Sequence, residues 1–437
     1  MDLTIRIIFN MLNTLDLRDK EGAYLDHLPR PKAASEPPIE AVKEIVTQVR
    51  LRGDAALTEY TQRFDGVEIE RFEVSRDEMQ LAYDNLEPAL REALEVAAEA
   101  IAGYYELELH EDREYHHNGL VVQQLTIPVS VAGCYVPGGK ARYPSSVLMT
   151  AIPARVAGVE EVILCVPPQS DGTVDAATLA AAHIASVDHL YKVGGAQAIA
   201  AMAYGTKSIR RADVIVGPGN VYVSQAKREV SNVVGIPTSY AGPSEVVVIA
   251  DNTVHAKWAV MDLIVQAEHG PDGLAWLITW DEDLAERAPR LAEKLLANSP
   301  RQDETLATLS EGGYVVLVRD FQQALDVSNA IAPEHLEIMS TKYEKMIPLI
   351  RNAGAVFLGP YAAASVGDYM AGPSHVLPTN GTARFASALS VVDFQKRVHA
   401  IEVSKSAMKA LAPHLSAIAQ SEGLWAHAMS ASIRVEK

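Results

Sequence analysis

Four short pairs in the C-terminal half of the chain each join a histidine to an acidic or amide side chain. The pairs are Gln266 with His269, Glu334 with His335, Asp368 with His375, and Glu422 with His427. Histidine transfers protons near neutral pH, and its neutral imidazole is the commonest metal ligand in proteins. Zinc sites take three or four ligands, which can come from distant segments. The four pairs therefore suffice for a metal site and a separate acid–base couple. This combination of residues is typical of an enzyme.

Gln266 and His269 lie in the last turn of a helix that the pattern predicts over residues 253–269, before Gly270 and Pro271 end it. Side chains three residues apart share a helix face, so both could reach one metal ion. The alternative is a polar helix end, where the dipole favours histidine. Because glutamine is an uncommon ligand, the spacing alone leaves both interpretations open.

Asp368 lies in the glycine-rich segment SVGDYMAGPSH, where a carboxylate is exposed enough to bind a hard cation. An aspartate in such a segment also commonly forms a turn. His427, in EGLWAHA, is equally compatible with an ordinary surface histidine. Neither residue identifies a metal site by itself.

Pro333, Glu334 and His335 form the sharpest acid–base candidate. The two adjacent side chains can face different parts of a bound substrate. Histidine has a pKa suited to taking an alcohol proton, and a carboxylate can activate water. The alternative is a helix–strand junction with a solvated glutamate and a capping histidine.

Four glycine-rich turns adjoin expected strands and lead into helical patterns. They begin at Gly133, Gly194, Gly217 and Gly242. Such turns allow close approach of the backbone to a ligand and present helix N-terminal amides to phosphate. None has the spacing of a dinucleotide fingerprint or of a Walker loop. They indicate an anion or nucleotide near the carboxyl ends of strands.

Composition excludes several other classes of protein. The chain has 437 residues, with 38 basic and 56 acidic side chains and a net charge of −18. This charge disfavours nucleic acid and anionic membrane surfaces as partners. Two cysteines, Cys134 and Cys165, argue against a disulfide scaffold and fit a reducing compartment. Without a signal-peptide pattern or a long apolar run, the sequence predicts a cytoplasmic protein.

The periodicity of apolar residues predicts an α/β protein built from parallel, doubly wound units. Residues 77–109 have helical spacing, and from about residue 120 short β-branched runs alternate with helical patterns. The expected strands are 159–166, 189–193, 212–216, 244–250, 274–280, 314–319 and 355–359. From about residue 390 we expect a helix over 402–420 and a short strand at ASIRVEK, in a region too small for its own core.

Longer strings resemble one family. GCYVPGG, SSVLMTAIPARVAG, VGGAQAIAAMAYGT, VGPGN, AGPSEV, QAEHG, APEHLE, GDYMAGPSHVLPT and DFQKR occur in this order. From about residue 38 to the end, the chain resembles histidinol dehydrogenase. The resemblance implies a homodimeric enzyme that binds one zinc ion per subunit. With NAD as the oxidant, the enzyme would oxidise L-histidinol through the aldehyde to L-histidine. One departure is that Gly372-Pro373-Ser374-His375 stands where the family usually has Gly-Thr-Asn-His.

The resemblance also implies roles for individual residues. Proton acceptors would be Glu334 and His335. The implied zinc ligands are Gln266, His269, Asp368 and His427. Substrate contacts would be Ser244, Gln266, His269, His335, Asp368, Glu422 and His427. NAD contacts would be Tyr135, Gln197 and Asn220.

The implied architecture is two incomplete Rossmann-like domains with small helical segments at both ends, in an intertwined dimer. The expected division is an N-terminal segment, 1–30; a first domain, 31–134 and 238–389; an NAD-binding domain, 135–237; and a tail, 390–437, exchanged between subunits. Three alternatives remain at this point. A related zinc and NAD dehydrogenase could oxidise another small alcohol, a zinc hydrolase would need only the metal and Glu334, and a binding protein would need no catalysis.

Overall fold

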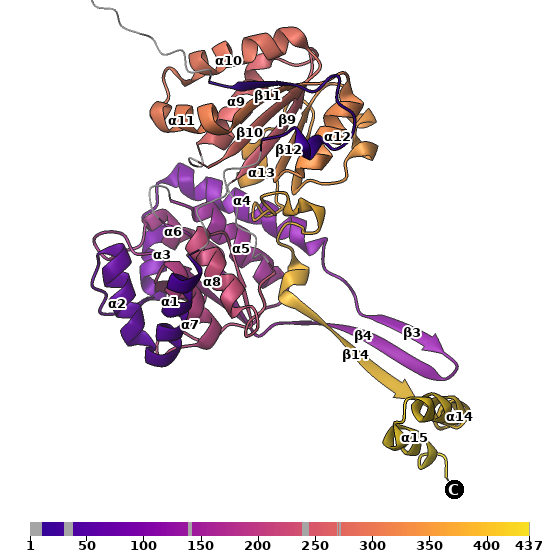
Figure 1. Cartoon of the computed structure of the whole chain (residues 1–437). Coiled ribbons are helices and arrows are strands. Elements are labelled where there is room, and N and C mark those ends of the chain that lie inside the picture. The colour runs from indigo at the N-terminus through magenta and orange to yellow at the C-terminus, as the bar shows by residue number, and fades with distance from the viewer. Residues whose placement is uncertain are drawn as a thin grey trace, which may run out of the picture.

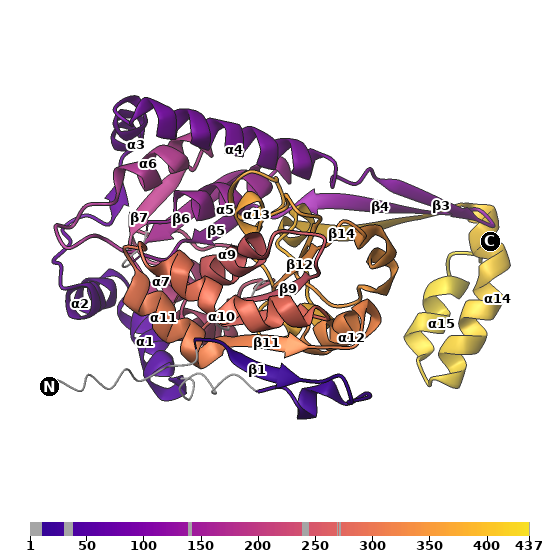
Figure 2. The same cartoon turned by 90° about the horizontal axis from the view of Figure 1, so that it is seen from above.

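The chain folds into two α/β lobes and a projecting arm (Figures 1 and 2). The computed structural model describes residues 11–29, 38–138, 142–237, 244–268, 270 and 272–436. Parallel sheets with helices on both faces confirm the α/β class that the alternating pattern predicts. Within these residues, no helix has the length and apolar character needed to cross a membrane.

The six-stranded lobe contains a parallel sheet in the order β1-β11-β10-β9-β12-β13. Its strands are β1 (Asn13–Asp16), β9 (Glu245–Ala250), β10 (Leu274–Thr279), β11 (Gly313–Leu317), β12 (His335–Met339) and β13 (Ala355–Leu358). One face packs on α9 (Ala256–Ala267), α10 (Glu282–Leu296) and α11 (Gln302–Gly312), and the other on α12 (Phe321–Ile331). Strand residues alternate between the two cores, as the pleat requires. The helix α13 (Ala364–Tyr369) follows β13.

The five-stranded lobe contains a second sheet in the order β2-β7-β6-β5-β8. Its strands are β2 (Glu73–Val74), β5 (Val131–Tyr135), β6 (Glu161–Val166), β7 (His189–Lys192) and β8 (Val214–Val216). All neighbouring strands are parallel except β2 with β7. One face packs on α3 (Arg76–Asp84), α4 (Pro88–Glu106), α5 (Pro144–Val156) and α6 (Ala176–Ile184). The other packs on α1 (Ile39–Arg52), α2 (Asp54–Asp65), α7 (Gly195–Tyr204) and α8 (Val221–Val230).

The packing of several segments differs from the expected domain division. The sequence-based division groups residues 31–134 with 238–389, but helices α1–α4 and strand β5 pack in the five-stranded lobe. Apolar residues of α1 and α4, such as Val42 and Ile101, are buried against that lobe's sheet. Helical periodicity shows which face of a helix is apolar, but not which of two sheets covers it.

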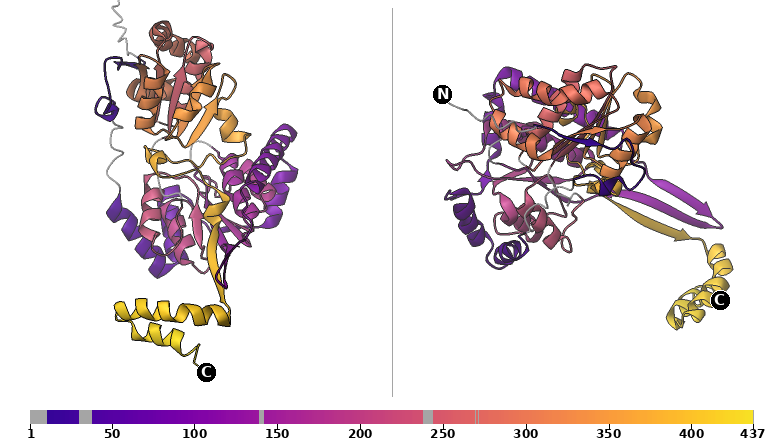
Figure 3. Two further views of the ribbon diagram at one scale, coloured as in Figure 1. Left: turned by 90° about the vertical axis from the view of Figure 1, so that its right-hand side faces the viewer. Right: turned by 45° about the horizontal axis from the view of Figure 1, so that its top comes forward.

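The arm consists of an antiparallel sheet, β14-β4-β3, with a helical hairpin at its end (Figure 3). Its elements are β3 (Arg113–His117), β4 (Leu120–Pro128), β14 (Gln395–Val403), α14 (Lys405–Ser421) and α15 (Trp425–Ser432). The strand β14 pairs with β4 along its whole length, from Gln395 opposite Pro128 to Val403 opposite Leu120. The arm therefore holds the C-terminal helices away from both lobes.

Several predicted elements have different limits in the structure. The helical run 77–109 is two helices, because Pro88 occupies the first turn of α4 and begins a new helix there. The strand predicted at ASIRVEK is wrong, since α15 extends to Ser432 and a turn follows. Short 3-10 helices lie at Tyr24–Asp26, Tyr343–Lys345, Ile347–Leu349, Thr382–Arg384 and Val391–Phe394.

A buried pair of carboxyl groups joins α9 to β12. Glu337 is fully buried, Asp262 is almost so, and the two carboxyl groups are neighbours. Burial raises the pKa of both groups, and the neighbouring Asp262 raises that of Glu337 further, to well above its usual value. Because two adjacent buried carboxylates cannot both ionise readily, the pair retains a proton, which we assign to Glu337.

This assignment predicts a pH-dependent effect of Glu337→Gln on stability. Folded Glu337 keeps a proton that the unfolded chain releases above its ordinary pKa of 4.5, so this group makes the wild type less stable as pH rises above that value. Glutamine mimics the protonated acid and does not titrate. In urea unfolding, the variant should gain stability relative to wild type by up to about 1.4 kcal/mol per pH unit. Parallel stability curves would contradict the assignment; Glu293→Gln, at an exposed position on α10, is the control.

Candidate functional site

The candidate site lies where the two lobes face each other. In the five-stranded lobe, the glycine-rich turns after β5, β7 and β8 lie at the carboxyl ends of the strands. In the six-stranded lobe, Ser244 directly precedes β9 and Glu334 directly precedes β12, so these residues lie at amino ends. The expected position near the carboxyl ends of strands thus applies to the turns after β5, β7 and β8, whereas Ser244 and Glu334 lie at the amino ends of their strands.

Glu334 is buried and held by hydrogen bonds. Its Oε2 atom accepts the backbone N–H of Glu245 at 3.0 Å, and its carboxyl group also bonds the Ser244 side chain. Burial raises the pKa of Glu334 to about 8, although these hydrogen bonds lower it. Glu245, buried beside it at the start of β9, has its pKa raised by burial to about 7. The solvated glutamate of the alternative interpretation is therefore excluded.

His335 is the first residue of β12 and is buried next to Glu334. Its Nδ1 atom lies 3.7 Å from Glu334 Oε2, and its Nε2 atom lies 3.9 Å from Asp368 Oδ1. Because side chains alternate along a strand, His335 and Glu337 point to the same face of the sheet, the one that α9 covers. The imidazole thus lies between two carboxyl groups that come from different segments.

The predicted metal ligands are only partly brought together. Gln266, in the last turn of α9, is buried, and its amide nitrogen has no hydrogen-bond partner in the described part of the chain. Asp368 of α13 lies beside His335, while His269 lies outside the described residues. No group of three or more His, Cys, Asp and Glu side chains suited to a metal occurs among the described residues. The carboxamide oxygen of Gln266 and the carboxylate of Asp368 are oxygen donors that nevertheless fit a zinc site completed by further ligands.

Glu422 and His427 do not lie at this site within one chain. Glu422 ends α14, His427 belongs to α15, and both are exposed on the helical hairpin of the arm. Figures 1 and 3 show this hairpin separated from both lobes. Within one chain, these two side chains therefore lie apart from Gln266, His335 and Asp368.

His375 holds the loop after α13 against α5. Its Nε2 atom lies 3.0 Å from Ser146 Oγ, and its Nδ1 atom lies 3.0 Å from the Asp368 carbonyl oxygen. Ser374, within the Gly-Pro-Ser-His departure, donates its hydroxyl to the Met149 carbonyl oxygen at 3.1 Å. Ser374 is thus buried with its hydroxyl group hydrogen-bonded. The contacts of His375 hold the loop next to Asp368.

The predicted NAD contacts lie along the carboxyl edge of the five-stranded sheet. Tyr135, at the end of β5, accepts the Gly195 N–H at 3.1 Å. Gln197 of α7 is buried, and its Oε1 atom has no partner in the part of the chain that the structure describes. Asn220 caps α8 by accepting two backbone N–H groups at 3.1 Å. A side chain at Gly217 is excluded, because its Cβ would lie 2.0 Å from the Tyr135 carbonyl oxygen.

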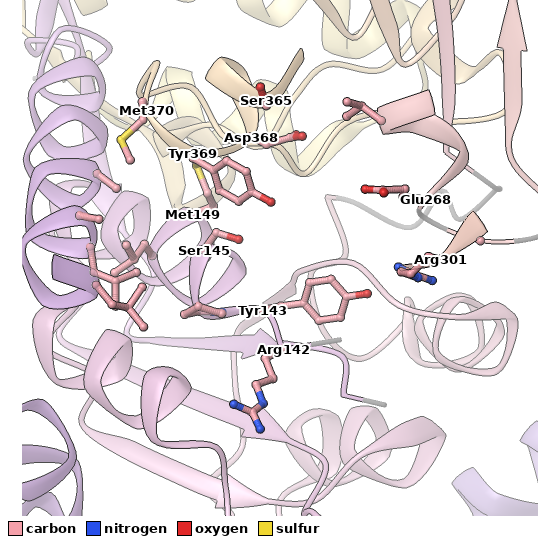
Figure 4. A pocket seen from close by; sticks show the side chains of 18 of the residues that line it. Arg142, Tyr143, Ser145, Met149, Glu268, Arg301, Ser365, Asp368, Tyr369 and Met370 are labelled. Atoms are coloured by element: carbon pink, nitrogen blue, oxygen red, sulfur yellow. The ribbon is translucent and has the colours of Figure 1, made fainter. Parts of the chain in front are cut away.

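A cavity of about 940 Å³ opens between α4, α5, α9, α11 and α13 (Figure 4). Its wall is largely apolar, and Asp368, Tyr143, Glu268 and Arg301 add polar groups. In Figure 4, Ser365, Asp368 and Tyr369 enter from the α13 side, and Tyr143 and Ser145 come from the start of α5. Glu334 and His335 are not among its lining residues. Asp368, which lies beside His335, is the lining residue that connects this cavity with the acid–base pair.

Lys227 is a polar residue at the site that the sequence analysis missed. It is buried in α8, and its Nζ atom donates to the Gly217 carbonyl oxygen. Desolvation lowers the pKa of Lys227 to about 7. A signal was present in the sequence, because Lys227 lies four residues after Val223 and three before Val230, on the apolar face of its helix.

Comparisons with known proteins agree along the whole chain. The family model described as histidinol dehydrogenase matches residues 28–435. A histidinol dehydrogenase of Pseudomonas putida is 46% identical over 438 residues, covering 99% of this chain and 98% of the relative. One from Cupriavidus pinatubonensis is 47% identical over 405 residues, covering 91% of each.

A solved structure supports the same relationship. The crystal structure of histidinol dehydrogenase from Elizabethkingia anophelis has a TM-score of 0.92 and 33% sequence identity, covering 97% of this chain and 98% of that one. Sequence similarity and fold thus agree over nearly the full length, and the chain belongs to the histidinol dehydrogenase family.

Proposed function

We propose that the chain is a zinc- and NAD-dependent enzyme that oxidises L-histidinol through L-histidinaldehyde to L-histidine, the last steps of histidine biosynthesis. The observation that carries this proposal is the buried pair Glu334 and His335, which lies between the glycine-rich edge of one lobe and Gln266 and Asp368 of the other. Family membership supplies the substrate. The reaction removes four electrons in two hydride transfers.

His335 is the proposed base of both oxidations. In the first, it takes the hydroxyl proton of the alcohol while hydride leaves the same carbon for the nicotinamide ring. In the second, it takes a proton from the hydrated aldehyde as the second hydride leaves. Its buried position supports this role, with Nδ1 3.7 Å from Glu334 Oε2 and Nε2 3.9 Å from Asp368 Oδ1, because a catalytic base must lie within reach of the group it deprotonates.

Glu334 is the proposed base that activates water between the two oxidations. Its ionised carboxylate removes a proton from water as the oxygen adds to the aldehyde carbon. With a pKa of about 8, it is a much better proton acceptor than a solvated glutamate, and enough of it is ionised near neutral pH to act. The hydrogen bonds from Ser244 and from the Glu245 N–H fix the direction of the carboxylate.

Zinc would be held by Gln266, His269 and Asp368 of one chain and by His427 of a second chain. When bound, the metal would fix the imidazole and amine of the substrate and thereby orient the reacting carbon. The proposed substrate contacts are Ser244, Gln266, His269, His335, Asp368, Glu422 and His427. NAD would contact Tyr135, Gln197 and Asn220, and the buried Gln197 oxygen without a described partner supports this assignment.

A homodimer that exchanges its C-terminal tail explains the position of the arm. The hairpin exposes large apolar side chains, including Ile418, Trp425 and Ile433, which are 62%, 73% and 57% exposed. Side chains of this kind are typical of a surface that another subunit covers. We infer that Glu422 and His427 enter the site of the second copy, next to its Asp368.

The direct test incubates purified protein with L-histidinol, NAD and zinc. Two NADH should form per histidine, and chelation should reduce the rate until zinc is restored. A related dehydrogenase of another alcohol would leave histidinol unconsumed, and a zinc hydrolase would form no NADH. One NADH per histidinol, with free aldehyde as the final product, would contradict the proposed four-electron reaction.

Separate assays of the two oxidations should distinguish Glu334 from His335. We expect Glu334→Gln to slow aldehyde oxidation by about 10²–10⁴-fold, the usual contribution of a general base, and to affect alcohol oxidation much less. Only the second step adds water. His335→Ala should slow both. An equal loss in both steps for Glu334→Gln would disprove the division, and Glu293→Gln, at an exposed position on α10, is the control.

Mixing two inactive variants should restore activity if the tail is exchanged. In a heterodimer of His335→Ala and His427→Ala, one site carries both defects and the other is intact. After reversible dissociation and random re-pairing, half of the dimers are mixed, so activity should return to about a quarter of wild type. With sites built within one chain, every site would keep one defect. Absence of recovery despite demonstrated subunit exchange would refute the shared site.

A further inference from the structure

A second, smaller cavity of about 180 Å³ lies directly at Glu334. It separates the loop after β8 from the segments that precede β9 and β12. Its lining residues include Gly217, Gly219 and Lys227 from one lobe and Ser244, Glu334 and His375 from the other. Unlike the larger cavity, it is therefore lined both by Glu334, the proposed water-activating carboxylate, and by the glycine-rich turn after β8.

Lys227 is the one residue with an ammonium or guanidinium group among the described residues that line this cavity. Its side chain is 2% exposed, so its charge is poorly screened by solvent. A buried lysine is costly unless an opposite charge offsets the lost hydration. At the cavity wall, its ammonium group can attract an anionic ligand that enters the cavity.

The surroundings of the reacting carbon are acidic. Glu334 lines the cavity, Glu245 is buried next to Glu334, and the charges of Glu245 and Asp368 raise the pKa of Glu334. The proposed reaction nevertheless creates a new carboxylate at the carbon beside Glu334. Water oxygen adds to the aldehyde carbon, the hydrate gives hydride to NAD and a proton to the base, and the resulting acid ionises. A cation in the same cavity offsets repulsion between this product and its neighbours.

We propose that Lys227 forms a carboxylate-binding subsite for the second oxidation, in which its ammonium group faces the carboxylate formed beside Glu334. This inference rests on the proposed function and adds a residue to it. The same group stabilises negative charge that develops on the hydrated aldehyde as it is oxidised. The alcohol substrate carries no negative charge at this carbon, so the first oxidation depends less on Lys227.

The competing explanation is that Lys227 only anchors the Gly217 loop through its bond to the carbonyl oxygen. Loss of an anchor would disturb the loop, raise the KM for NAD and affect both oxidations equally. Two variants separate the explanations. Lys227→Met removes the charge and the bond, whereas Lys227→Gln removes the charge and keeps an N–H donor.

The test compares L-histidine with histamine, which lacks the carboxylate, as inhibitors of alcohol oxidation by the zinc-loaded enzyme. Both variants should raise the Ki for histidine about 10- to 100-fold, as expected for a lost hydrogen bond between charged groups. The Ki for histamine should stay within about twofold of wild type, as should both values for Arg228→Gln, an exposed control on the same helix. Aldehyde oxidation should fall more than alcohol oxidation.

Equal weakening of both inhibitors, or wild-type behaviour of Lys227→Gln, would overturn the proposal. If the variants do not fold, the wild-type enzyme still provides a test. Histidine should then bind at least about tenfold more tightly than histidinamide, whose neutral amide replaces the carboxylate. Equal or weaker binding of histidine would refute the subsite, while turnover of histidinol by the same preparation would leave the proposed function intact.

Discussion

Burial of ionisable side chains between two sheets is the constraint on which the candidate site depends. Glu245, Glu334 and His335 lie at the amino ends of β9 and β12, and all three side chains are buried. Carboxyl groups in such a position bind protons more tightly than they do in water. The same desolvation acts on Lys227 in the opposite direction. Acid and base strengths at the site thus follow from the burial of these side chains.

The strands hold Glu334 and His335 in place, and the loop after α13 holds Asp368. Glu334 is fixed by the N–H of Glu245 on the adjacent strand, and His335 belongs to β12 itself. Asp368 is held by the contact of His375 with its carbonyl oxygen and with Ser146 of the other lobe. A change in the angle between the lobes would therefore alter the acid–base pair and the proposed metal site together.

The periodicity of apolar residues was sufficient to predict the α/β class and most central strands. It did not predict β12, because HLEIM contains two ionisable residues that are buried through hydrogen bonding and pairing rather than through apolar character. The strands of the arm were also missed. Their side chains are mostly exposed or half-buried, so β3, β4 and β14 lack the apolar pattern of a core strand.

For the site, the sequence identified Glu334, His335, Gln266 and Asp368 by residue type and resemblance, and the structure places these four near one another or in buried positions. It could not indicate that Glu422 and His427 lie on a separate hairpin, since separation in space depends on the length of β14. Lys227 was overlooked because lysine is normally assigned to a solvated helix face.

The most direct test of the account is the protonation state of Glu334. Carbon-13 NMR of glutamate carboxyl groups, comparing wild type with Glu334→Gln in the metal-free protein, isolates the signal of this residue. The account predicts a titration near pH 8, because burial raises the pKa of Glu334 to about that value. A titration near the ordinary value of 4.5 would contradict it and would mean that water reaches the carboxyl group.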